Sequence, residues 1–104
     1  MSRWADAGTQ LERALLRDAA AEGIMLTTLA TDGTQWASVT FTGTRHRITI
    51  AAIGSPLLDR WLAALPDAEI QLRGHLVADL VVAGERRGGE RVEIELEALT
   101  VEDC

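Results

Sequence analysis

The chain has 104 residues, of which 47% are hydrophobic and 25% charged, a composition typical of a folded globular protein and not of a disordered one. This length has room for one hydrophobic core, so we expect a single domain over residues 1–104. The formal net charge is −6, and all of the excess lies in residues 54–104, which hold five arginines and eleven acidic residues. A basic face is therefore missing, which excludes nucleic acid and acidic membranes as expected partners.

The sequence also bears on location. No apolar run approaches the ~18–20 residues of a membrane span, and the N-terminal residues lack the apolar region of a signal peptide. The single cysteine, Cys104, has no partner for an internal disulfide, as is common in a reducing compartment. We therefore expect a cytoplasmic protein.

The N-terminal part of the chain predicts a helix over residues 10–22. Thr9 and Glu12 have the spacing of a capping box, in which two side chains bond the free N–H groups at a helix start. Leucines follow at helical spacing and predict one core-facing side. Gly23 then supplies the residue type that commonly ends a helix.

Segments rich in strand-forming residues come next. Asp32-Gly33 is a strong hairpin signal, and Gly43-Thr44 is predicted to be a second turn. In the third segment, alternation places His46 on one face, with Arg45 and Arg47 on the other. The predicted strands cover residues 24–31, 35–42 and 45–53.

The middle of the chain predicts a second helix and a further strand. Ser55 and Pro56 are a typical helix start, an apolar stripe follows, and Pro66 ends the helix. Over residues 68–82 apolar and polar residues alternate. This pattern predicts one long strand with a bulge at Gly74, and a tight hairpin at Gly74 is the alternative.

The C-terminal part predicts a polar turn at residues 84–89 and a last strand over residues 91–101. Apolar residues alternate with glutamates along this strand until Leu99 and Val101, which are apolar on the glutamate side. That break indicates either a bulge or burial on both faces. The element order is then α-β-β-β-α-β-β. It predicts an α+β two-layer sandwich, a mainly antiparallel sheet of about five strands with two helices on one face.

The arginines and histidines of the strands allow two interpretations. In the first, guanidinium and imidazole groups converge on a carboxylate or phosphate of a ligand. Four residues predicted to share the polar sheet face would form this site: Arg45, Arg47, Arg73 and His75. The second interpretation, which we favour, pairs them with glutamates of the last strand. These glutamates are Glu93, Glu95 and Glu97.

The open face is also predicted to carry apolar residues. Trp36, Val77 and Val81 fall on the side of the sheet away from the helices. Tryptophan and arginine are enriched at interface hot spots, so this side predicts a homo-oligomer, a dimer in particular, with a further protein partner as an open possibility.

Catalytic chemistry finds little support. Two histidines in different strands and one cysteine match no metal-ligand spacing, and no G-x-S-x-G nucleophile motif is present. We therefore expect neither a metal nor another cofactor, and a protein that is not an enzyme. The favoured function is a binding or assembly module that self-associates through the open sheet face. The alternatives are a small anionic-ligand-binding or enzymatic domain, and an acidic adaptor that docks a basic protein.

Overall fold

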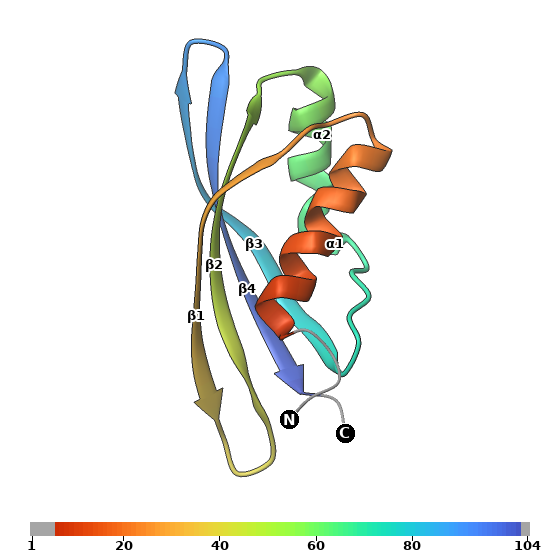
Figure 1. Cartoon of the computed structure of the whole chain (residues 1–104), viewed down its shortest axis with the longest axis vertical. Helices are drawn as coiled ribbons and strands as arrows, with labels where there is room; N and C mark the ends of the chain where they lie inside the picture. The colour runs from red at the N-terminus through yellow and green to blue at the C-terminus, as the bar shows by residue number, and fades with distance from the viewer. Residues whose placement is uncertain (1–5, 103–104) are drawn as a thin grey trace.

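The computed structural model of the chain describes residues 6–102, and Cys104 lies outside this range. Four strands form one sheet in the spatial order β1-β2-β4-β3, with every neighbouring pair antiparallel. Both helices cover the same face of the sheet (Figure 1). The elements are α1 (Ala7–Ala21), β1 (Thr27–Ala37), β2 (Thr42–Ile53), α2 (Pro56–Ala64), the 3₁₀ turn η1 (Leu65–Asp67), β3 (His75–Gly88) and β4 (Arg91–Glu102).

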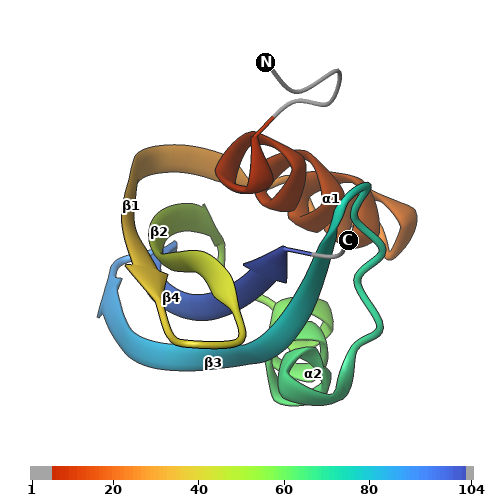
Figure 2. The same ribbon diagram turned by 90° about the horizontal axis from the view of Figure 1, so that it is seen from below.

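The order α-β-β-α-β-β confirms the predicted α+β class, with one helical layer on one sheet layer. The predicted number of strands is wrong, because the sheet has four and the first half of the chain contributes two of them. The strands are long and curved (Figure 2), and the molecule measures 45 Å along its longest axis and 23 Å across. Neither helix of the described chain has the length and apolar character needed to cross a membrane.

Helix α1 begins earlier than predicted. Its N-cap is Asp6, whose Oδ1 accepts a hydrogen bond from the backbone N–H of Thr9 at 2.8 Å. Asp6 therefore takes the capping role predicted for Thr9, and this hydrogen bond lowers the pKa of the Asp6 carboxyl. The predicted stop is confirmed, since Gly23 lies just after the helix with a φ of 83°.

The predicted hairpin at Asp32-Gly33 is wrong. Strand β1 continues through both residues, and Asp32 lies opposite Arg47 on β2. This continuous ladder keeps the backbone groups paired and overrides the local turn preference. The chain turns instead between Ser38 and Phe41, where the Ser38 N–H donates to the Phe41 carbonyl oxygen at 2.7 Å. The predicted turn at Gly43-Thr44 lies inside β2 and is also wrong.

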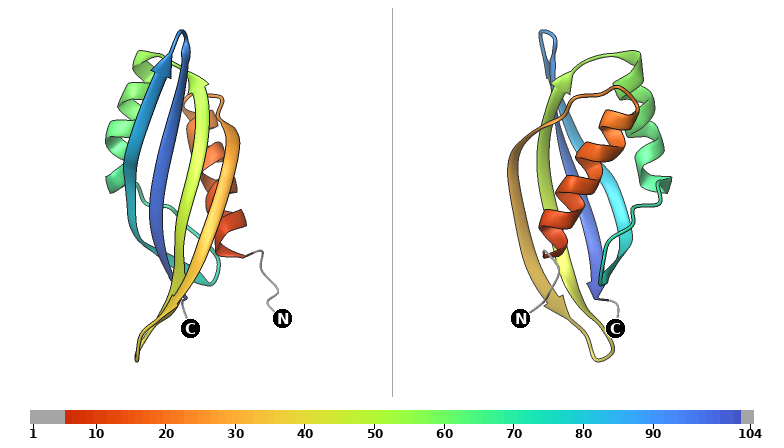
Figure 3. Two further views of the ribbon diagram at one scale, coloured as in Figure 1. Left: turned by 90° about the vertical axis from the view of Figure 1, so that its left-hand side faces the viewer. Right: turned by 45° about the vertical axis from the view of Figure 1, so that its right-hand side comes forward.

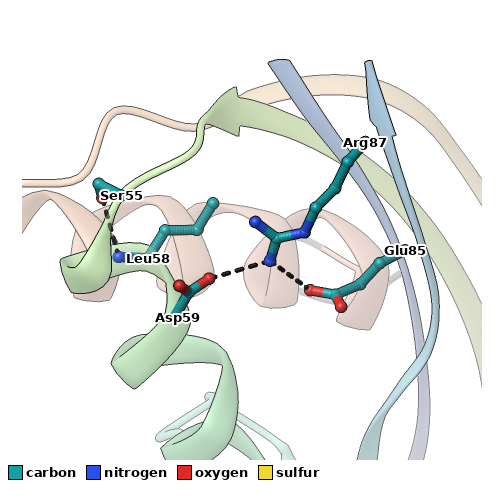
Figure 4. Close-up of polar contacts among 5 residues, drawn as sticks. All are labelled: Ser55, Leu58, Asp59, Glu85 and Arg87. Atoms are coloured by element: carbon teal, nitrogen blue, oxygen red, sulfur yellow. Dashed lines mark hydrogen bonds and ion pairs between the residues drawn. The ribbon is translucent and has the colours of Figure 1, made fainter. Parts of the chain in front are cut away.

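Helix α2 begins at the predicted position. The Ser55 Oγ accepts a hydrogen bond from the Leu58 N–H at 3.1 Å (Figure 4). The same figure shows how α2 contacts the β3–β4 hairpin: Arg87 Nη2 lies 2.9 Å from Asp59 Oδ1 and 3.4 Å from Glu85 Oε1. These groups are exposed, so the ion pairs orient the hairpin more than they stabilise the fold.

Strand β3 begins at His75, so the long strand over residues 68–82 and the hairpin at Gly74 are both wrong predictions. Gly74 has a φ of 78°, a left-handed conformation that interrupts extended backbone. The preceding residue is held by α1: the Arg73 N–H donates to Gln10 Oε1 at 2.7 Å, and Gln10 Nε2 donates to the Arg73 carbonyl oxygen at 2.9 Å. These two hydrogen bonds keep the segment beside α1 and out of the sheet.

A bulge near the start of β3 changes which residues face the helices. The register against β4 shifts between Val77 and Asp79. Because strand side chains alternate, the extra residue moves His75 and Val77 to the helix side, while Asp79 and Val81 stay on the other side. The prediction that His75, Val77 and Val81 lie on the side away from the helices is therefore wrong for His75 and Val77.

The β3–β4 hairpin is longer than predicted. Strand β3 continues to Gly88, so the turn predicted at residues 84–89 is reduced to Gly89 and Glu90, and Gly89 has a φ of 62°. Strand β4 begins at the predicted residue, and its register against β2 has no shift. The bulge predicted at Leu99 and Val101 is therefore absent from β4, and burial on both faces is correct only in part, because both residues are half-buried on the side away from the helices.

The core lies between the helices and the sheet. Leu11 of α1, Ile50 of β2 and Ile94 of β4 are among the residues with no exposed surface. Trp61 of α2, also in this core, donates from its indole Nε1 to Asp18 Oδ2 of α1 at 2.8 Å. The buried tryptophan thus satisfies its polar group and links the two helices.

Candidate functional site

The open face is the side of the sheet that the helices leave uncovered (Figure 3, left). Residues paired across neighbouring strands point to the same side, so the registers define rows that cross all four strands. We name three rows after their members on β1 or β2. From β1 to β3, the Trp36 row contains Trp36, Gly43, Val101 and Leu76; the Arg45 row contains Thr34, Arg45, Leu99 and Asp79; the Arg47 row contains Asp32, Arg47, Glu97 and Val81.

Arg47 pairs with the glutamates of β4. Its Nε lies 2.9 Å from Glu95 Oε1, and its Nη2 lies 3.7 Å from Glu97 Oε2. Further along β4, Arg91 Nε lies 3.8 Å from Glu93 Oε2. For Arg47 the favoured interpretation from the sequence is therefore correct. The side chains of Arg47 and Glu95 are 62% and 41% exposed, so this pair contributes no more than about 1 kcal/mol.

Arg45 has a different environment. It lines a shallow hollow of about 510 Å³ on the open face, together with Asp79, Val81 and Leu99. Within residues 6–102, neither Arg45 nor Asp79 takes part in an ion pair. The Arg45 row thus presents one unpaired positive and one unpaired negative side chain, with Leu99 between them.

The charges around this hollow do not favour an anion. Its lining holds two guanidinium groups and three carboxylates. A phosphate or carboxylate ligand would meet a net negative environment unless one or more of these carboxylates were protonated. The charged residues concerned are Arg45, Arg47, Asp32, Asp79 and Glu97.

The other two members of the predicted anion site lie elsewhere. Arg73 belongs to the segment that Gln10 holds beside α1, outside the sheet. His75 lies opposite Glu102 in the register of β3 and β4, and its side chain is on the helix side of the sheet. The structure therefore brings Arg45 and Arg47 together, and it separates both from Arg73 and His75.

The Trp36 row forms the apolar end of the open face. A methyl group added to Gly43 would lie 2.9 Å from Cζ2 of Trp36, so the indole ring lies against this glycine. Leu76 is 57% exposed, and Val101 lies between Leu76 and Gly43 in the row. With Leu99 of the next row, these residues form what we call the apolar patch: Trp36, Leu76, Leu99 and Val101.

Of the three residues that the sequence predicts on the open face, the structure places two there. Trp36 and Val81 lie on the open face, whereas Val77 packs against the core. The sequence reasoning missed Leu76, because the bulge in β3 that turns it outward leaves no clear sequence signal. For Leu99 and Val101, the sequence did carry a signal: they are apolar at positions where the alternation of β4 predicts polar residues.

A second polar cluster lies on the helix side of the sheet. His46 is 4% exposed, and its Nε2 lies 2.8 Å from Thr100 Oγ1. The Thr100 hydroxyl donates to the Thr44 carbonyl oxygen at 3.4 Å, so the Thr100 oxygen accepts a hydrogen bond from Nε2–H of His46. Burial lowers the pKa of His46; the carboxylate of Asp6 opposes this shift, and the charge of His75 reinforces it.

Fold and face together define a class: a two-layer α+β protein whose four-stranded antiparallel sheet has one covered face and one open face. Comparisons of the chain with protein-family models, with curated proteins and with solved structures gave no match.

Proposed function

We propose that the protein is a non-catalytic assembly module whose open sheet face binds a second copy of the same chain. The observation that carries this proposal is the apolar patch. Its residues come from β1, β3 and β4, with Trp36 lying against Gly43 of β2, at one end of a face that no element of the described chain covers. Burying the patch against another molecule removes apolar surface from water, which is the main driving force of association.

The sheet edges are less suited to association than the face. Strand β1 has a register shift between Thr28 and Ala30, and β3 has two shifts of its own. Bulges of this kind interrupt the regular edge that another strand would need for pairing. Asp32-Gly33 further weakens β1 as a template for an added strand.

The charge of the open face also favours a second copy over a strongly basic partner. The registers place five carboxylates and four guanidinium groups on this face. Three of the carboxylates already lie within 4 Å of arginines on the same face, at 2.9, 3.7 and 3.8 Å. A nearly neutral surface of mixed charge meets its own copy without large net repulsion, whereas an acidic adaptor would need unpaired acidic residues.

The test is the molar mass in solution, measured by light scattering because the elongated shape distorts elution volumes. We expect twice the chain mass of 11.3 kDa at high concentration. Leu76→Glu on the open face should shift the protein to monomer. The matched control is Leu57→Glu on α2, where the replaced leucine is 43% exposed on the helix side; it should stay dimeric. A monomeric wild-type protein at millimolar concentration would refute the proposal.

A further inference from the structure

We propose a specific arrangement for this dimer, which rests on the function proposed above. The two open faces stack with the two-fold axis parallel to β4, so that Arg45 of each copy pairs with Asp79 of the other. The arrangement follows from where opposite charges and complementary apolar groups lie relative to β4.

The Arg45 row is self-complementary about β4. Arg45 on β2 and Asp79 on β3 lie one strand to either side of Leu99 on β4. A two-fold axis along β4 in the plane of the interface exchanges these two sides. It places Arg45 of one copy above Asp79 of the other, twice, with Leu99 packed against its own copy between the two pairs.

The distance between stacked sheets fits such a pair. Sheets that pack face to face lie about 10 Å apart, with the side chains of the two inner faces interdigitating. A long arginine opposite a short aspartate fills that space better than two long or two short side chains. Both residues are exposed and form no ion pair within the described chain, so both are free to pair across the interface.

The Trp36 row supports the same axis independently. Gly43 on β2 and Leu76 on β3 lie at mirrored positions about Val101 on β4. The indole of Trp36 lies against Gly43 and so fills the place of its missing side chain. The axis therefore places Leu76 of one copy against the Trp36 ring of the other. This contact removes the exposed Leu76 side chain from water.

The glutamates of β4 set the limit of the contact. Glu93, Glu95 and Glu97 lie on the same strand as the axis, so full overlap would place each carboxylate near its own copy. Because the strands are curved (Figure 2), β4 runs parallel to the axis over only part of its length, and beyond that part the two copies of β4 diverge. The contact is therefore centred on Leu99 and Val101, with the glutamate end of β4 splayed into solvent.

Charge reversal tests the arrangement. We expect Arg45→Asp and Asp79→Arg each to raise the Kd of the homodimer by about 100-fold or more, because each places two like-charged pairs in the interface. An equimolar mixture of the two variants should form a heterodimer, since both pairs then have opposite charges. The double variant should return to a homodimer. Arg86→Asp, a matched control on the same face beyond the contact, should stay dimeric.

The outcomes separate the two proposals. If Leu76→Glu is monomeric while Arg45→Asp and Asp79→Arg remain dimeric, the face is the interface and the arrangement is overturned. If the single variants are monomeric but their mixture is not a heterodimer, the two charges do not meet across the interface, and the arrangement is again overturned. If the wild-type chain is monomeric, both proposals fail. Circular dichroism of each variant confirms that its fold is intact.

Discussion

The indole ring of Trp36 lies against Gly43 on the neighbouring strand, and it does so because Gly43 has no side chain. A methyl group at this position would lie 2.9 Å from Cζ2 of the ring, and it would also overlap the carbonyl oxygen of Thr100. Gly43 is buried in a paired strand and its φ is not positive, so close approach of its neighbours, and not backbone conformation, requires glycine here.

Gly43→Ala should therefore destabilise the protein by about 2 kcal/mol or more, because backbone and ring must both move. Urea unfolding followed by far-UV circular dichroism measures the change. Gly84→Ala is the matched control, since a methyl group on this strand glycine meets nothing within 4 Å. We expect the control to change stability by no more than about 0.5 kcal/mol, and equal losses for the two variants would contradict this account.

Stability should fall as the pH drops through the ordinary histidine pKa of 6.5, because burial disfavours the charged form of His46 in the folded protein. Burial lowers its pKa in the folded state below the ordinary value of 6.5, so the unfolded chain takes up a proton at a higher pH than the folded chain. The stability that uncharged His46 contributes is fully present above its unfolded-state pKa and is lost as the pH falls below that pKa. His46→Gln should flatten this part of the curve of unfolding free energy against pH.

The other histidine provides the control for that experiment. His75 is less buried, and its charge reinforces the shift at His46 without producing most of it. His75→Gln should therefore keep most of the pH dependence. The assignment to His46 is wrong if His75→Gln flattens the curve and His46→Gln does not.

Ser55→Ala should destabilise α2 by about 1 kcal/mol, because the Leu58 N–H loses the hydroxyl that caps it at 3.1 Å (Figure 4). Ser55→Asp keeps an acceptor at the N-cap and should restore most of the stability. Thermal unfolding of the three proteins ranks them. An alanine variant as stable as the wild type would show that the cap contributes nothing.

Arg47→Gln should have a small effect on stability, no more than about 1 kcal/mol, even though Arg47 contacts two glutamates. The pairs are exposed, so salt screens them, and the difference from wild type should shrink at 1 M NaCl. Unfolding in urea at low and high salt, at a concentration where wild type and variant have the same oligomeric state, checks this. A large, salt-independent loss would point to packing by the arginine stem instead.

The sequence predicted those parts of the fold that local patterns determine. The start of α2 at Ser55, the stop at Gly23 and the strand over residues 91–101 each depend on residues next to one another in the chain. The placement of His46 on the buried side followed from simple alternation within one strand.

Long-range contacts determined the parts that could not be predicted. Asp32-Gly33 would form a turn in isolation, but β2 pairs with the strand on both sides of it. The start of β3 depends on Gln10, which is 63 residues away from Arg73. The bulge between Val77 and Asp79 then exchanges the faces of the predicted site residues, so His75 moves away from Arg45 and Arg47.

The order of the strands has a consequence for how the chain reaches this fold. The two central strands are β2 and β4, and their register joins Gly43 to Val101. The centre of the sheet therefore forms only when the last residues of β4 are available. A nascent chain that still lacks β4 contains the β1–β2 pair and β3, but it lacks the strand that joins them in the sheet. Folding on the ribosome must wait until β4 has emerged, and loss of β4 removes the centre of the sheet and not its edge.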